Sequence, residues 1–130
     1  YVFKYKGVSV TMNGAAKKLI KKAGKPSKKT VKKSCAYKGK DRTYTYKDFQ
    51  LKTYSKTNNG AEYVSEIRFR SNKAVTKEGI RIGSSLKDVT KKYGKAKARF
   101  GVYTFKKGSS KLQIMLNGNK VSAIRYFASK

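Results

Sequence analysis

The fold is decided by residues 112–126, LQIMLNGNKVSAIRY, which have the pattern of two short strands around a tight turn. Apolar and polar residues alternate on both sides of the turn, as in strands that bury one face. Asn117-Gly118 favours a two-residue turn between antiparallel strands, and Leu116 and Val121 flank it. This stretch therefore predicts a β-hairpin with one apolar face.

A short amphipathic helix precedes this hairpin in the sequence. Leu86, Val89 and Tyr93 fall on one face at helical spacing. Ser85 begins a capping box, because an acid follows it three residues later. The pattern predicts a helix over about residues 85–93, followed by an antiparallel meander of three strands.

The first half of the chain carries the same order of motifs. Five segments match: 7–10 with 79–82, 16–25 with 86–95, 44–47 with 103–106, 49–51 with 112–114 and 64–69 with 121–126. Five matches in the same order predict an internal duplication. Repeat one spans 1–76, with a helix at about 14–24 and strands within 43–70, and repeat two spans 77–130, with a helix at about 85–93 and strands within 98–128. The expected fold class is α+β: two tandem helix-plus-antiparallel-meander repeats form one compact unit, with the helices packed on one face of a shared or paired sheet.

Motifs between Gly79 and Tyr126 resemble a family of small secreted lipoproteins from Gram-positive anaerobes. The motifs are a short Gly-Ile-x-Ile-Gly segment, a helix that ends in Tyr-Gly-Lys and a meander that closes on Val-Ser-x-Ile-Arg-Tyr. Residues 34–46, SCAYKGKDRTYTY, resemble the corresponding segment in the first copy of that family. The arrangement is similar to the tandem α/β repeats of the β-lactamase inhibitor protein, although no motif here matches its binding loops.

The resemblance implies an extracellular or cell-surface location. Tyr1 is not an initiator residue, and the resemblance implies that a secretion signal or a lipid-attachment segment lies upstream of it. No apolar run in the sequence approaches the ~20 residues that a membrane-spanning helix needs.

The chain is strongly basic. Its 130 residues include 34 Lys and Arg, 6 Asp and Glu and no His, which gives a formal net charge of +28. The 38% hydrophobic and 12% aromatic content indicates a folded chain rather than a disordered polycation. Lys outnumbers Arg by 28 to 6, which suits diffuse attraction to anions better than recognition by the planar Arg fork. Such a charge attracts polyanions through contacts that weaken as the salt concentration rises.

The composition excludes several kinds of catalytic and metal site. With no His and one Cys, the chain has no imidazole base, no internal disulfide and no zinc site built from several cysteines. The glycines form neither a phosphate-binding loop nor a dinucleotide fingerprint. The six carboxylates are Asp41, Asp48, Glu62, Glu66, Glu78 and Asp88. A turn explains Asp48 and a capping box explains Asp88, so we expect no enzyme activity, no cofactor and no metal.

The main candidate site is a set of lysines on and after the first predicted helix. They are Lys17, Lys18, Lys21, Lys22, Lys25, Lys28, Lys29, Lys32 and Lys33. The helical lysines fall opposite Leu19, so they face away from the expected core. These lysines could neutralise phosphates on a wall polymer, lipid headgroups or nucleic acid. The alternative is a solvated helix face followed by a basic loop.

Two other candidate groups have structural explanations. The aromatic residues near lysines are Tyr37, Tyr44, Tyr46, Tyr54 and Tyr63, which could stack on bases or sugars. Strand alternation predicts instead that most of them are buried. Cys35 lies among lysines that would activate its thiolate, but no His or second Cys completes a nucleophile or redox pair, so a buried strand position is favoured.

Together these observations predict a non-enzymatic extracytoplasmic binding domain, in a cell-envelope lipoprotein. The expected partner is an anionic component of the wall or membrane, or a protein. Two alternatives stay open. One is a nucleic-acid-binding protein of low specificity, which is less favoured. The other is an inhibitor of a secreted enzyme, which rests on fold analogy alone.

Overall fold

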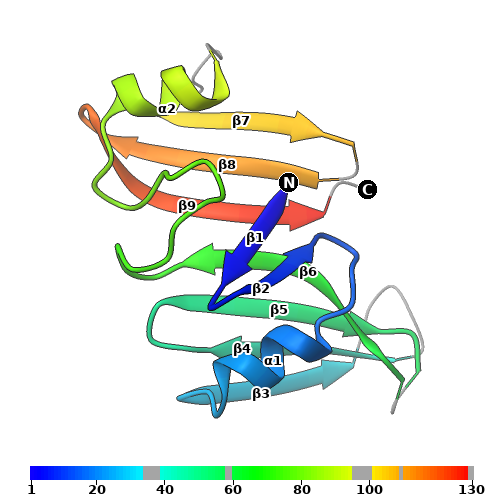
Figure 1. Ribbon diagram of the computed structural model, residues 1–130. Coiled ribbons are helices and arrows are strands. Elements are labelled where there is room, and N and C mark those ends of the chain that lie inside the picture. Colours follow the sequence, from blue (N-terminus) through cyan, green and yellow to red (C-terminus); the bar gives the residue numbers. More distant parts are fainter. Residues whose placement is uncertain (34–38, 58–59, 95–100, 109, 129–130) are drawn as a thin grey trace.

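The fold is a seven-stranded antiparallel sheet with a separate two-stranded hairpin and two short helices (Figure 1). The computed structural model describes residues 1–33, 39–57, 60–94, 101–108 and 110–128. In chain order the elements are β1 (Val2–Tyr5), β2 (Val8–Thr11), α1 (Lys17–Ala23), β3 (Lys28–Lys33), β4 (Lys40–Thr45), β5 (Phe49–Ser55), β6 (Glu62–Phe69), α2 (Leu86–Tyr93), β7 (Val102–Lys107), β8 (Ser110–Asn117) and β9 (Lys120–Ala128). The strand order in the large sheet is β3-β4-β5-β6-β9-β8-β7, so the two halves of the chain meet where β6 pairs with β9.

The expected α+β fold class, with tandem helix-plus-meander repeats, is wrong. Strands account for 53% of the described residues and helices for 13%, so the fold is mainly β. The helices are short, with 7 residues in α1 and 8 in α2, because a glycine with positive φ ends each of them. The halves are also unequal, since the described residues of the second half contain no counterpart of strands β1, β2 and β3.

Two segments of the first half account for the difference. Val8–Val10, part of the segment that matches 79–82, belongs to β2, which pairs with β1. Residues 28–33, interpreted as part of a basic loop, form β3 alongside β4. The helix expected at about 14–24 is confined to Lys17–Ala23, because the backbone of residues 13–16 bonds to β6 instead. The division into two repeats stays a prediction.

The hairpin of β8 and β9 is confirmed, with its turn one residue later than predicted. Asn117 pairs with Lys120, so Gly118 and Asn119 occupy the two turn positions. Gly118 has a φ of +65°, which glycine adopts without strain at the first position of a type II′ turn. The glycine rather than the preceding asparagine therefore sets the register of this hairpin.

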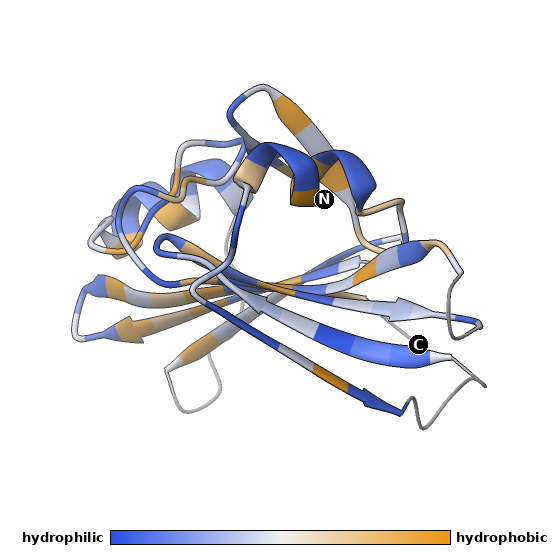
Figure 2. Cartoon of the chain, turned by 90° about the horizontal axis from the view of Figure 1, so that it is seen from below, coloured by the Kyte–Doolittle hydropathy of each residue, from blue (hydrophilic) through white to orange (hydrophobic). Residues whose placement is uncertain are grey.

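The core lies between the sheet and the elements that cover one of its faces. These elements are α1, α2 and the β1–β2 hairpin (Figures 1 and 2). Phe3 of β1 is fully buried, and its ring centroid lies 5.3 Å from that of Phe49 and 6.2 Å from that of Tyr126. Leu19 of α1 and Val89 of α2 are buried on the same face. The opposite face of the sheet carries no helix in the part of the chain that the structure describes.

Candidate polyanion-binding site

The nine predicted lysines, which we call the α1–β3 lysines, lie on α1, on β3 and in the turn between them. All nine are exposed. On α1, Leu19 is buried against the core, and the lysines of the helix are exposed to solvent. The first turn of α1 has no acidic residue, and Lys21 and Lys22 lie in its last turn, where the helix dipole favours cations. The helix therefore offers solvent only positive side-chain charges.

β3 is an edge strand, and all six of its residues are exposed. Successive side chains of a strand point to opposite faces of the sheet. Lys29 lies opposite Tyr44, which is buried on the helix-covered side, so Lys29 and Lys33 are on that side. Lys29 Nζ lies 5.1 Å from the centroid of the Tyr44 ring, within the range of a cation–π contact. Lys28 and Lys32 point to the other face, so the β3 edge is cationic on both sides.

None of the α1–β3 lysines is paired with an acid among the described residues. All three ion pairs of that part of the chain are made to Glu66. Asp41 is opposite Lys32 in the register of β3 and β4, but no ion pair joins them in the described structure. The positive charge at the end of the sheet formed by β3 and covered by α1 is therefore uncompensated, and it attracts anions.

The core interpretation of the tyrosines is confirmed where burial is greatest. Tyr44 and Tyr46 are 3% and 6% exposed. Tyr54 and Tyr63 are half-buried, with ring centroids 5.6 Å apart, and the Tyr54 hydroxyl hydrogen-bonds the Asn13 side chain at 3.0 Å. Tyr37 and Cys35 lie outside the described residues. The described tyrosines therefore do not form an open stacking platform.

Two carboxylates accept hydrogen bonds from tyrosines. Tyr44 donates to Glu62 and Tyr93 donates to Glu78, each with an oxygen–oxygen distance of 2.6 Å. Burial first, and then the hydrogen bond to the carboxylate, raise the pKa of both tyrosines above the usual value. Each carboxylate therefore stabilises the neutral form of the tyrosine that donates to it.

Two further acidic residues make hydrogen bonds in the structure, Asp48 through its carboxylate and Asp88 through its backbone nitrogen. Ser71 Oγ donates to Asp48 Oδ1 at 2.7 Å, and the backbone nitrogen of Asp88 donates to Ser85 Oγ at 3.2 Å. The second contact is the cap predicted for α2. Within the described ranges, no group of three or more His, Cys, Asp or Glu residues lies together so that it could hold a metal ion. None of the helices in these ranges is long and apolar enough to cross a membrane.

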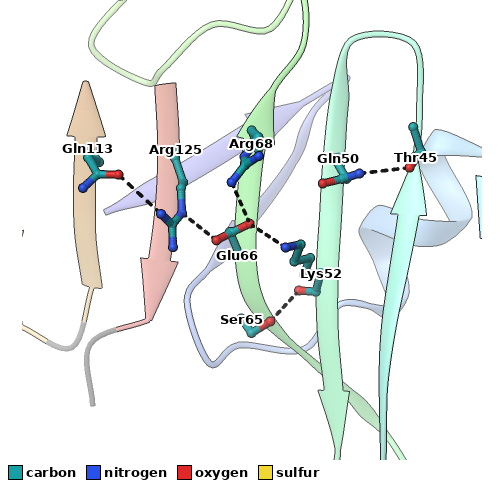
Figure 3. Close-up of polar contacts among 8 residues, drawn as sticks. All are labelled: Thr45, Gln50, Lys52, Ser65, Glu66, Arg68, Gln113 and Arg125. Atoms are coloured by element: carbon teal, nitrogen blue, oxygen red, sulfur yellow. Dashed lines mark hydrogen bonds and ion pairs between the residues drawn. The ribbon is translucent and has the colours of Figure 1, made fainter. Parts of the chain in front are cut away.

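Sequence reasoning missed a charged cluster on the sheet face opposite the helices (Figure 3). Glu66 on β6 is 8% exposed, and its Oε1 accepts a hydrogen bond from Arg125 Nε on β9 at 2.5 Å. Its Oε2 lies 3.3 Å from Lys52 Nζ and 4.0 Å from Arg68 Nη2. Arg125 Nη1 also donates to Gln113 Oε1 at 3.4 Å. One carboxylate therefore holds three cations. Strand alternation marks each of these positions as outward-facing, but only the register brings them together.

No protein-family model, curated protein or solved structure matches this chain. The resemblance to small secreted lipoproteins stays a prediction. Function therefore has to be inferred from the charge and geometry of the described residues.

Proposed function

We propose that this protein is a non-enzymatic binding module that holds a phosphate polymer of the cell envelope on its α1–β3 lysines. The observation that carries the proposal is the exposure of nine lysines on consecutive elements, with no acid paired to them in the described structure. Many weak contacts of this kind give a binding affinity that falls steeply as the salt concentration rises.

The shape of this end suits a flexible chain better than a rigid partner. The six residues of β3 extend over ~20 Å and the seven residues of α1 over ~10 Å. Lysine ammonium groups are point charges on mobile stems, so they can follow phosphates whose spacing is not fixed. A specific nucleic-acid reader would depend on arginine forks at base edges, and none of the nine residues is arginine.

The location outside the cytoplasm is part of the same proposal. It is supported by the resemblance of residues 34–46 and of Gly79–Tyr126 to small secreted lipoproteins. Fractionation of cells that express the natural gene tests it directly. Recovery of the protein with the wall or membrane supports the proposal, and recovery only with the cytoplasm overturns it.

The binding proposal is tested with a triple variant and a control of equal charge. The test variant changes Lys17, Lys21 and Lys28 to Glu, and the control changes Lys87, Lys91 and Lys92 on α2 to Glu. Calorimetry with purified teichoic acid in 0.15 M salt should show at least a ~10-fold loss of affinity for the test variant and less than ~3-fold for the control. Equal losses would mean that only the net charge matters.

Double-stranded DNA and anionic lipid vesicles serve as competing ligands in the same titrations. The proposal predicts that teichoic acid binds more tightly than either of them at matched salt. Tighter binding to DNA would favour the low-specificity nucleic-acid alternative. Tighter binding to vesicles would mean that the partner is an anionic membrane surface rather than a wall polymer.

A further inference from the structure

The face of the sheet opposite the helices carries a second cationic surface, distinct from α1. Figure 2 shows the sheet from its edge, with both helices and the β1–β2 hairpin on one side of it. Side chains that alternate with the buried core residues must therefore project from the other side. Their identities follow from the strand register, which is continuous from β3 to β7.

The register aligns these outward side chains into two adjacent rows, each crossing all seven strands. The first row, from β3 to β7, is Thr30, Thr43, Lys52, Glu66, Phe127, Lys111 and Lys106. The second row is Lys28, Thr45, Gln50, Arg68, Arg125, Gln113 and Thr104. We call these 14 residues the two-row band. It contains six cations, one carboxylate, six residues with hydroxyl or amide side chains and one aromatic ring, so its net charge is +5.

The centre of the two-row band is held in place by its own contacts (Figure 3). Glu66 is the buried member, and every other member is exposed or half-exposed. The Arg125 guanidinium bonds Glu66 and lies 4.5 Å from the centroid of the Phe127 ring. In the second row, Gln50 Nε2 donates to Thr45 Oγ1 at 3.1 Å. Groups that are already oriented lose less conformational entropy when a ligand binds.

We propose that the two-row band binds an extended acidic polysaccharide, a chain of sugars that carry carboxylate groups. Seven strands at ~4.8 Å spacing give the band a length of ~29 Å, enough for several sugar units along one line. Arg68 is exposed and offers a planar fork that matches a carboxylate, whereas Arg125 is already bonded to Glu66 and Gln113. The threonine and glutamine side chains between the cations are donors and acceptors suited to sugar hydroxyls.

The aromatic content of the band separates this ligand from single-stranded nucleic acid. Proteins that hold single strands depend on open aromatic rings for base stacking. Phe127 is the one aromatic residue of the band, and both Arg125 and Lys111 lie over its ring, at 4.5 and 5.9 Å from the centroid. The single ring of the band is already in contact with two cations, so hydrogen bonds and charge pairs have to supply most of the binding free energy.

The test compares two double variants with the same change of charge. The band variant is Arg68→Gln with Lys111→Gln, and the control is Lys17→Gln with Lys21→Gln on α1. Calorimetry with oligogalacturonates of increasing length should show a loss of about tenfold or more for the band variant and less than about twofold for the control. An equal or larger loss in the control overturns the proposal.

Chain length and a second variant complete the test. Affinity should rise with oligomer length until the chain spans ~29 Å and then level off. Continued growth beyond that length would indicate diffuse attraction and overturn the proposal. Thr43→Glu with Thr104→Glu leaves the Glu66 contacts untouched and should cause the same loss, which covers the case in which the first variant does not fold.

Teichoic acid and poly(dT) distinguish this proposal from that of the α1–β3 lysines. The band variant should bind teichoic acid as the unmodified chain does, because its α1–β3 lysines are intact. Loss of oligogalacturonate binding alone supports the band. Tighter binding of poly(dT) than of oligogalacturonate to the unmodified chain, with the band variant impaired for poly(dT), would replace the polysaccharide with a single-stranded nucleic acid.

Discussion

The two ends of the sheet are built from the same kinds of elements but differ in how these elements are held. At one end, edge strand β3 has six exposed residues and α1 has no side-chain cap. At the other end, Phe105 of edge strand β7 is half-buried and its ring centroid lies 5.3 Å from that of Tyr93 on α2, which Ser85 caps. The β7 end is anchored by side-chain packing, whereas β3 is held by backbone pairing with β4. The lysine-bearing edge is therefore free for ligands because it adds little to the core.

The largest effect that this comparison predicts concerns one apolar side chain on each edge strand. Phe105→Ala should lower the free energy of unfolding by ~2 kcal/mol, because it removes a half-buried ring that contacts Tyr93. Val31→Ala on β3 should change it by less than ~0.5 kcal/mol, because Val31 is 48% exposed. Urea denaturation of both variants gives the two values.

These two substitutions also test whether β3 contributes less to stability than β7 does. If Val31→Ala destabilises the protein as much as Phe105→Ala, then β3 is packed against something that its exposure does not reveal. In that case the β3 edge would be a structural element rather than a free surface, and the proposed role of its lysines would lose its basis.

Alkaline pH provides a smaller effect that should reach both ends. Burial and a hydrogen bond to Glu78 raise the pKa of Tyr93, and burial and a hydrogen bond to Glu62 raise that of Tyr44. The folded state then keeps protons that the unfolded chain loses above about pH 10, so stability falls as the pH rises beyond that value. Each tyrosine contributes a slope of up to about 1.4 kcal/mol per pH unit.

Phenylalanine variants assign these slopes to the two ends. Tyr93→Phe and Tyr44→Phe should each reduce the pH dependence of the unfolding free energy, measured by urea denaturation between about pH 9 and about pH 11. Below about pH 9 the two variants should have no pH dependence that the unmodified chain lacks. A reduction for Tyr93→Phe alone would mean that the β3–β4 end has already opened at that pH. No reduction in either variant would contradict the assigned cause.

The sequence predicts those parts of the fold that depend on a few adjacent residues, such as helix ends and tight turns. The capping box at Ser85 and the glycine that ends the helix placed α2 within one residue of its observed start. The hairpin at Asn117-Gly118 was also predicted, and its register differs by one residue because positive φ belongs at Gly118. These features depend on the backbone preferences of a few adjacent residues, and those preferences follow from the residue types alone.

The missed features depend on partners that are distant in the sequence. The segment KKTVKK of β3 has no apolar alternation, because both of its faces are exposed and only pairing with β4 makes it a strand. The two-row band requires the register of seven strands, and a shift of one residue would turn each side chain to the other face. The α1–β3 lysines were found from charge alone, but their division between the two faces of the sheet was not.

The smallest predicted effect concerns one charge at the start of each helix. The first turn of α1 contains no acid, whereas that of α2 contains Asp88. Because the helix dipole favours negative charge at this position, Lys17→Glu should raise the free energy of unfolding by about 0.5 kcal/mol at low salt, and less in 0.15 M salt. Lys87→Glu should gain less, because the new carboxylate lies next to Asp88. Urea denaturation at two salt concentrations measures both.

A gain at Lys17 together with weaker teichoic acid binding would mean that this lysine lowers stability while it serves binding. No gain at Lys17 would show that the positive charge of α1 carries no energetic cost, and the contrast between the two helices would then be one of binding alone.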